Sequence, residues 1–257
     1  VYLSTPHNTH IQYLIPALEA GKHVLCEKSI TLNSDELARA RKVADEKGVV
    51  LAEAMTLYHM PIYKKLSELV NSGALGKLRF VQMNFGSYKD YDMKNRFFNR
   101  SLAGGALLDI GVYALSFVRY FMTAQPDQIA SQVLRAPTGV DEQAGILLQN
   151  KEGEMATLAL SLHAKQPKRG MAAFDKGYIE IYDYPRAQEA TITYTEDGRK
   201  EVIREGSTAK ALQYEVLDME QAVANGGKGM CQEYTKDVMD LMTAIRQQWG
   251  LTYPEEE

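Results

Sequence analysis

The sequence predicts an α/β portion with a parallel sheet, followed by an α+β portion with a large, mostly antiparallel open sheet. Short apolar segments alternate with helix-length segments at the start of the chain, a spacing typical of parallel strands joined by right-handed crossovers. The expected strands are 1–4, 23–26 and 49–52, and the expected helices are 8–20 and 33–47. Further along, strands separated by turn signals such as T-G at 138–139 predict antiparallel pairing over 128–195. We place the boundary so that the domains are 1–58 and 59–257.

Local signals support each of the first two helices. Apolar residues at Ile11, Leu14 and Leu18 follow the helical period, and Gly21 stands in the usual position after a helix end. Asn33 is a typical helix cap, and Gly48 follows the second helix.

The second portion begins with a helix and ends with two. The expected helices are 61–72, 104–122, 209–224 and 231–248, and a long strand is expected over 77–87. Residues 95–102 are expected to form a loop.

Composition excludes several classes of protein. The chain of 257 residues is 45% hydrophobic and 24% charged, with a net charge of −4, so we expect no nucleic-acid partner. No apolar run approaches roughly 18 residues, so we expect no membrane span. Cys26 and Cys231 are far apart, which argues against a disulfide scaffold or a structural zinc site and favours a cytoplasmic location.

Polar residues follow two of the predicted parallel strands. The segment V-L-C-E-K-S-I ends the second strand with Glu27 and Lys28, and 5–7 (T-P-H) follows the first. Carboxyl ends of parallel strands are where ligands bind in open α/β sheets. Taken alone, Lys28 is more typical of a solvated lysine than of a functional one, because most lysines are exposed; its position at the strand end beside Glu27 favours function. His7 and His10 lack acidic or thiol partners at suitable spacing, so no metal is expected.

The segment G-G-A-L-L-D-I-G-V-Y over 104–113 places a carboxylate in an apolar helix. Asp109 and Tyr113 are four residues apart and share a helix face. A buried carboxylate requires a charged or hydrogen-bonding partner, although Asp109 could also cap a backbone and Tyr113 could be a packed aromatic. The glycines indicate a close approach to the backbone. Arg96 could hold an anion or lie free on the surface.

These motifs together resemble the Gfo/Idh/MocA oxidoreductases. The resemblance lies in 5–10, in 19–24 (E-A-G-K-H-V) with Glu27-Lys28, in 104–113, and in 249–254 (W-G-L-T-Y-P). Tyrosine at the last position of the second motif is typical of the branch with dimeric dihydrodiol dehydrogenase and glucose-fructose oxidoreductase. The resemblance covers essentially the whole chain.

The resemblance implies a Rossmann-like domain at 1–58, of which the chain holds the C-terminal part, and hydride transfer between NAD or NADP and a small sugar, polyol or trans-dihydrodiol. NADP is favoured, because the tyrosine-bearing branch resembles NADP users. The implied catalytic residues are Lys28, Tyr113 and Asp109. Lys28 would polarise the substrate oxygen, Tyr113 would exchange a proton with a pKa lowered by that ammonium, and Asp109 would orient Lys28 or the substrate. The implied cofactor contacts are Thr5, Pro6, His7, His10, Glu27 and Lys28, and the implied substrate contacts are Arg96 and Tyr113.

Two departures from the family pattern carry expectations of their own. Ser29 stands where the family has proline, which predicts a trans peptide bond and a different aim for Lys28. No Gly-rich phosphate loop precedes Val1, which leads us to expect an N-terminally incomplete chain. The alternative is a non-catalytic binding or regulatory relative. In either case we expect a homodimer through the antiparallel sheet.

Overall fold

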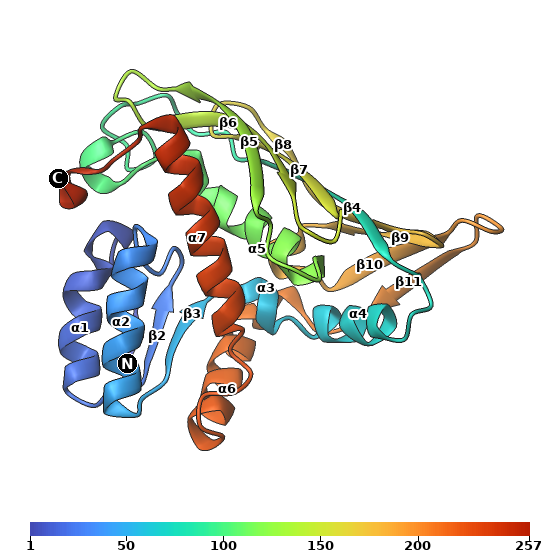
Figure 1. Ribbon diagram of the computed structural model, residues 1–257, viewed down its shortest axis with the longest axis horizontal. Helices are drawn as coiled ribbons and strands as arrows, with labels where there is room; N and C mark the ends of the chain where they lie inside the picture. Colours follow the sequence, from blue (N-terminus) through green and yellow to red (C-terminus); the bar gives the residue numbers. More distant parts are fainter.

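A three-stranded parallel sheet and an eight-stranded sheet lie side by side, with helix α7 (Gln232–Trp249) running between them (Figure 1). This computed structural model describes residues 1–257. Helix α7 packs against α2 and β3 of the first part and against α5 and β5 of the second. Its buried face, which includes Val238, Met242 and Ile245, therefore joins both halves of the core.

The three-stranded sheet confirms the predicted parallel arrangement. Its order is β1-β2-β3, and both strand pairs are parallel. The elements are β1 (Tyr2–Leu3), α1 (His10–Glu19), β2 (Val24–Glu27), α2 (Ser34–Lys47) and β3 (Leu51–Ala54). The predicted cap is present, because Asn33 Oδ1 accepts a hydrogen bond from Glu36 N at 2.9 Å. Gly48 ends the same helix with a φ of 64°, a conformation that favours glycine.

The eight-stranded sheet has the order β11-β10-β9-β8-β4-β7-β6-β5. Its strands are β4 (Leu78–Gly86), β5 (Gln128–Arg135), β6 (Asp141–Gln149), β7 (Met155–Ser161), β8 (Gln166–Phe174), β9 (Gly177–Tyr182), β10 (Glu189–Tyr194) and β11 (Lys200–Arg204). All pairs are antiparallel except β4 with β7, which is parallel. Strand β4 lies between β7 and β8, which follow one another in the sequence. The turn signals alone could not show this insertion. Strand β11 lies beyond the predicted range.

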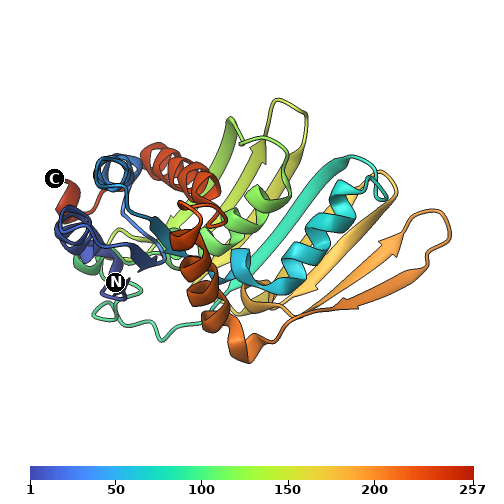
Figure 2. The ribbon, with the colours of Figure 1, turned by 90° about the horizontal axis from the view of Figure 1, so that it is seen from below.

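Helices cover one face of this sheet and leave the other face open (Figures 1 and 2). The remaining helices are α3 (Thr56–His59), α4 (Pro61–Asn71), α5 (Val112–Phe121) and α6 (Ala211–Ala224). Short helical segments are η1 (His7–Thr9), η2 (Arg100–Leu102), η3 (Leu107–Gly111), η4 (Tyr184–Arg186), η5 (Thr208–Lys210) and η6 (Pro254–Glu256). The helical run Arg100–Phe121 is long and apolar enough to cross a membrane, but 83% of its most apolar window is buried inside the fold.

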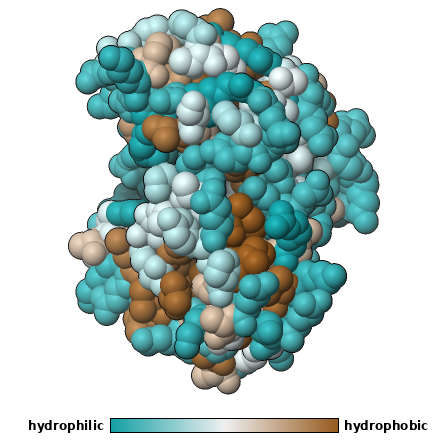
Figure 3. Space-filling view, turned by 90° about the vertical axis from the view of Figure 1, so that its left-hand side faces the viewer, coloured by the Kyte–Doolittle hydropathy of each residue, from teal (hydrophilic) through white to brown (hydrophobic).

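Apolar surface extends outside the core along α6. Val216, Met219 and Val223 line an open hollow together with Tyr2 and Leu25 of the edge and central strands. Apolar side chains also gather in the lower half of the face shown in Figure 3. The part of α6 that packs on β2 and β3 is therefore continuous with an exposed apolar surface.

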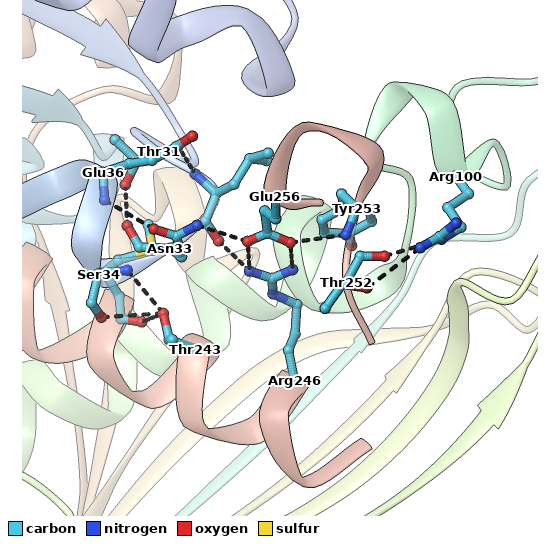
Figure 4. A network of polar contacts seen from close by, with 12 residues as sticks. Thr31, Asn33, Ser34, Glu36, Arg100, Thr243, Arg246, Thr252, Tyr253 and Glu256 are labelled. Atoms are coloured by element: carbon cyan, nitrogen blue, oxygen red, sulfur yellow. Dashed lines mark hydrogen bonds and ion pairs between the residues drawn. The ribbon is translucent and has the colours of Figure 1, made fainter. Parts of the chain in front are cut away.

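The last residues of the chain form hydrogen bonds with both parts of the fold (Figure 4). Arg246 of α7 forms two hydrogen bonds with Glu256, at 2.6 and 2.7 Å, and donates a third to Leu32 O at 2.7 Å. Asn33 Nδ2 also donates to Glu256, at 2.8 Å. On the other side, the Tyr253 hydroxyl donates to Gly104 O at 2.8 Å. We call residues 246–257 the C-terminal clasp. It connects the turn after β2 to the first residue of the 104–113 motif.

We expect the Glu256→Gln substitution to lower the free energy of unfolding by roughly 3 kcal/mol, because it leaves the Arg246 guanidinium buried without its counter-charge. Arg246 is only 3% exposed. Urea denaturation measures the difference. The control is Glu257→Gln, which removes an exposed pair with Arg100 and should cost under about 1 kcal/mol. Equal effects of the two substitutions would contradict this role of the clasp.

Candidate active site

Lys28 and Asp109 meet where the end of β2 faces the motif over 104–113. Lys28 Nζ donates to Asp109 O at 2.6 Å and lies 3.0 Å from Asp109 Oδ1. Both side chains are nearly buried, with 16% and 11% of their surfaces exposed. An ammonium has three donors, so one N–H of Lys28 is left for another ligand.

The expectation of a trans peptide bond at Ser29 is wrong, because the Lys28–Ser29 bond is cis. The expected difference in the aim of Lys28 stays a prediction; its ammonium reaches Asp109. Ser29 Oγ donates to Leu108 O at 2.9 Å. Glu53 of β3 accepts from Ile30 N at 3.0 Å and from Thr235 Oγ1 at 3.2 Å. Side-chain hydrogen bonds therefore hold the turn after Lys28 on both sides.

The helix that carries the second motif begins with a π-helical turn, η3, rather than the predicted α-helix. Its glycines allow close packing, as the sequence indicates. A Cβ on Gly105 would lie 2.1 Å from Asp141 Oδ1, and one on Gly111 would lie 2.9 Å from Leu160 Cδ1. Asp141 Oδ2 accepts from Leu107 N at 2.6 Å and so holds the first turn of the motif. π-Helical turns occur frequently at functional sites.

Tyr113 lies beside Lys28, with its ring centroid 5.1 Å from Nζ. The Phe85 ring lies on another side, at a centroid distance of 6.1 Å. The expectation of a lowered pKa is wrong. Burial raises the pKa of Tyr113 above its usual value, and the Glu27 carboxylate raises it further. Tyr113 is therefore a neutral phenol at physiological pH and can donate a proton.

Asp109 is ionised. Burial would raise its pKa, but the Lys28 ammonium and the Arg96 guanidinium outweigh burial and hold the pKa below its ordinary value. Arg96 is half-exposed, with Nη2 3.5 Å from Asp109 Oδ1, and its guanidinium stacks on Phe97 at 4.2 Å. The predicted substrate contact Arg96 thus lies at the open side of the Lys28–Asp109 pair.

The predicted residues after β1 surround the same edge of the sheet. His7 Nε2 lies 2.7 Å from Ala103 O, just before the second motif, and burial lowers its pKa to about 4, so the ring is neutral. His10 is fully buried, and its ring nitrogens lie 2.9 Å from Ser29 O and 2.8 Å from Thr5 O. The His10 ring therefore lies between the segment after β1 and the turn after Lys28. Pro6 is exposed at this edge.

The strand edge suits a polar cofactor. Thr5 Oγ1 is buried there without a hydrogen-bond partner, and buried polar atoms are normally paired. Glu27 follows Leu25 on the α6 side of β2 and accepts a hydrogen bond from the Tyr2 hydroxyl. Thr5, Pro6, His7, Glu27 and Lys28 would face the nicotinamide end of a dinucleotide at the carboxyl ends of these strands.

Three titratable residues near this site were given no chemical role in our sequence analysis. They are Asp141, Glu215 of α6 and Arg186 of η4. Asp141 follows the T-G turn at the start of β6, and that position could have suggested a cap for another element. Glu215 and Arg186 carry no local signal, because only the fold brings them to Tyr113 and Glu27.

Comparison with known proteins shows the family of this chain. A family described as "Oxidoreductase family, NAD-binding Rossmann fold" matches residues 1–55, and the "GFO/IDH/MocA C-terminal domain" matches 63–182. Trans-1,2-dihydrobenzene-1,2-diol dehydrogenase of Xenopus tropicalis is 27% identical over 99% of this chain and 79% of its own length.

Two solved structures share the fold. One is the 3-ketoreductase KijD10 of Actinomadura kijaniata in complex with NADP and TDP-benzene. It has a TM-score of 0.82 at 23% identity over 96% of this chain and 77% of its own. The other is the aldose-aldose oxidoreductase of Caulobacter crescentus with glycerol, with a TM-score of 0.86 at 23% identity over 97% of this chain and 76% of its own.

The chain belongs to the Gfo/Idh/MocA family of oxidoreductases, whose N-terminal domain is a dinucleotide-binding Rossmann fold. This confirms the expected family, the expected α/β fold and the expected class of enzyme.

Three buried carboxyls around the site should make the protein less stable at alkaline pH. Burial raises the pKa of Glu53 and Asp141 to about 7 and that of Glu215 to about 8. Their unfolded pKa values lie near 4, so their contribution to stability is complete below pH 4 and is lost as pH rises to about 8. We expect the free energy of unfolding in urea to fall by about 2 kcal/mol between pH 6.5 and 8.5. A flat profile over this range would contradict the expectation.

Proposed function

We propose that the protein interconverts a hydroxyl and a carbonyl group on a small sugar, polyol or trans-dihydrodiol, with NADP or NAD as the hydride carrier. The observation that carries the proposal is the Lys28–Asp109 pair with Tyr113 beside it. It sets a cation and a neutral phenol at the carboxyl ends of the parallel strands, where this fold class binds ligands.

The role of each residue in the site follows from its charge. Asp109 takes two donors of Lys28 and leaves the third for the substrate oxygen, whose developing negative charge the ammonium stabilises. Tyr113 donates its proton to that oxygen in the direction of reduction and accepts it in the direction of oxidation. Arg96, at the open side of the pair, is suited to hold a second oxygen of the substrate.

The cofactor supplies or accepts the hydride, and the protein supplies position and charge. Glu27 and Thr5 are suited to accept and donate hydrogen bonds at its nicotinamide end. The complex of the 3-ketoreductase with NADP supports NADP over NAD. The names of the relatives support dihydrodiols and sugars as the substrate class.

Lys28→Ala tests the proposal. We expect kcat with NADPH to fall at least about a hundredfold, because the charge on the substrate oxygen loses its stabilising cation. NADPH binding, followed by calorimetry, should remain. The matched control is Lys22→Ala, an exposed lysine before β2, which should change neither quantity. Unchanged turnover in Lys28→Ala would refute the assignment. NADPH and NADH binding with no turnover in the unmodified protein would favour the non-catalytic alternative.

We also propose that the protein forms a homodimer through the open face of the eight-stranded sheet. Next to β4 this face carries the Arg169–Glu180 ion pair of β8 and β9. On the part of the face formed by β4, β7, β6 and β5, cross-strand neighbours are uncharged, and most are small or apolar. They are Gln82, Asn84, Ala130, Gln132, Gly145, Leu147, Thr157 and Ala159. Interface cores are depleted of charge in the same way.

Both cysteines are free thiols, which supports the cytoplasmic location expected from the sequence.

Leu147→Asp should convert the dimer to a monomer, because it places a carboxylate at the centre of the uncharged region. Light scattering at micromolar concentration gives the mass. Leu212→Asp, at an exposed position of α6, is the control and should leave the mass unchanged. A monomeric unmodified protein would rule out the proposed interface.

A further inference from the structure

Glu215 is a buried carboxyl that no part of the protein satisfies. It is 1% exposed, its Oε1 is enclosed without a hydrogen-bond partner, and its side chain forms no ion pair. Glu53 and Asp141 are equally buried, but each accepts hydrogen bonds that hold the backbone or a side chain. Leaving a buried polar group unpaired is costly, so an unpaired group in a native structure calls for an explanation. Glu215 therefore has no packing role that explains a carboxyl.

The fold directs Glu215 to the end of the sheet where Glu27 lies. Glu215, Met219 and Ala222 are spaced along one buried face of α6. Met219 and Ala222 pack with Leu25 of β2 and Ala54 of β3. Glu215 is one turn before Met219, and Glu27 is two residues after Leu25 on the same face of its strand. The two carboxyls therefore face one another across the layer between α6 and the sheet.

The groups around Glu215 come from every element packed near it. Glu27 on β2 and Glu53 on β3 carry like charge, whereas Arg186 on η4 carries opposite charge. Tyr2 on β1 and Tyr113 on α5 lie near enough for the Glu215 charge to act on their hydroxyls. On α3, the neighbour of α6, Tyr58 is neutral and His59 is paired with Asp218 at 2.9 Å.

Burial, and secondly the charge of Glu27, raise the pKa of Glu215 to about 8. At neutral pH this side chain is therefore a carboxylic acid with a proton to give. Tyr113 forms no hydrogen bond to a protein acid that could return its proton after it has donated one. Glu215 is a neutral acid close enough to Tyr113 for its charge to act on the Tyr113 hydroxyl.

We propose that Glu215 returns a proton to Tyr113 after each reduction of a carbonyl substrate. The proposal rests on the proposed function and adds one group to it. The substrate carbon gains the hydride, and the Tyr113 O–H bond breaks as its proton passes to the substrate oxygen. The Glu215 O–H bond then breaks, and its proton passes to the phenolate oxygen. The Glu215 carboxylate takes a new proton from solvent, so one proton is consumed for each carbonyl reduced.

Three variants test this role. Glu215→Gln keeps the shape and polarity of the side chain and removes the titrating proton. Glu215→Met removes the unsatisfied carboxyl altogether. Glu220→Gln makes the same exchange at an exposed position one turn further along α6. For each variant, kcat for NADPH-dependent reduction is measured from pH 6 to 9, together with the NADPH dissociation constant and the thermal unfolding midpoint.

In the unmodified protein and Glu220→Gln, we expect reductive kcat to fall as pH rises through about 8. In Glu215→Gln and Glu215→Met, kcat at neutral pH should be about tenfold lower. In these two variants kcat should not fall as pH rises through about 8, and NADPH binding should be retained. Glu215→Met should also unfold at a higher temperature, because the buried carboxyl is gone. A merely structural residue would not combine higher stability with slower turnover.

Infrared difference spectra give a readout that does not depend on activity. A protonated carboxyl band that titrates near pH 8 should disappear in Glu215→Gln and persist in Glu220→Gln. If that band is missing from the unmodified protein, or if Glu215→Gln keeps the full pH profile of kcat, Glu215 does not donate the proton. If the unmodified protein binds NADPH but reduces no carbonyl substrate, the proposed function fails and this proposal fails with it.

Discussion

The site depends on one constraint, namely that the end of β2 and the π-helical turn of the second motif are held in contact. Lys28 and Asp109 come from opposite sides of the junction between the two sheets, and neither could stay buried without the other. The C-terminal clasp applies the constraint, because Arg246 and Glu256 bind the turn at Leu32 and Asn33 while Tyr253 binds Gly104. The clasp thus connects both partners of the ion pair through one short segment.

Electrostatics divides the acids of this region into two groups. Asp109 has cations on two sides and stays ionised, so it can hold Lys28 in place. Glu53, Asp141 and Glu215 are buried without cations close enough to offset desolvation, so their pKa values rise toward neutrality. Two of these acids brace the backbone on either side of the site, and the third is unsatisfied. Tyr113 stays protonated for the same reason, since burial and the Glu27 carboxylate raise its pKa and outweigh the Arg186 guanidinium.

Sequence patterns correctly predicted those features that are determined within a few residues, namely the helix ends and the close packing at glycines. Asn33 and Gly48 bound a helix because a cap and a left-handed glycine act within a few residues. The glycines of the second motif predicted close packing, which Gly105 and Gly111 have. The prediction failed where distant segments decide. The insertion of β4 between β7 and β8, the π-helical turn at Leu107–Gly111 and the pKa of Tyr113 all depend on what packs against them.

The sequence by itself determined the order of strands and helices in the first part of the chain, the caps, and the two motifs that bear Lys28, Asp109 and Tyr113, because propensity, periodicity and glycine chemistry act locally. Only the tertiary structure decided which charges meet. Glu215, Arg186 and Asp141 are far in sequence from the residues they influence, and the sign of a pKa shift depends on burial and neighbours together. The distance between two charges is a property of the folded chain, and electrostatic energy depends on that distance.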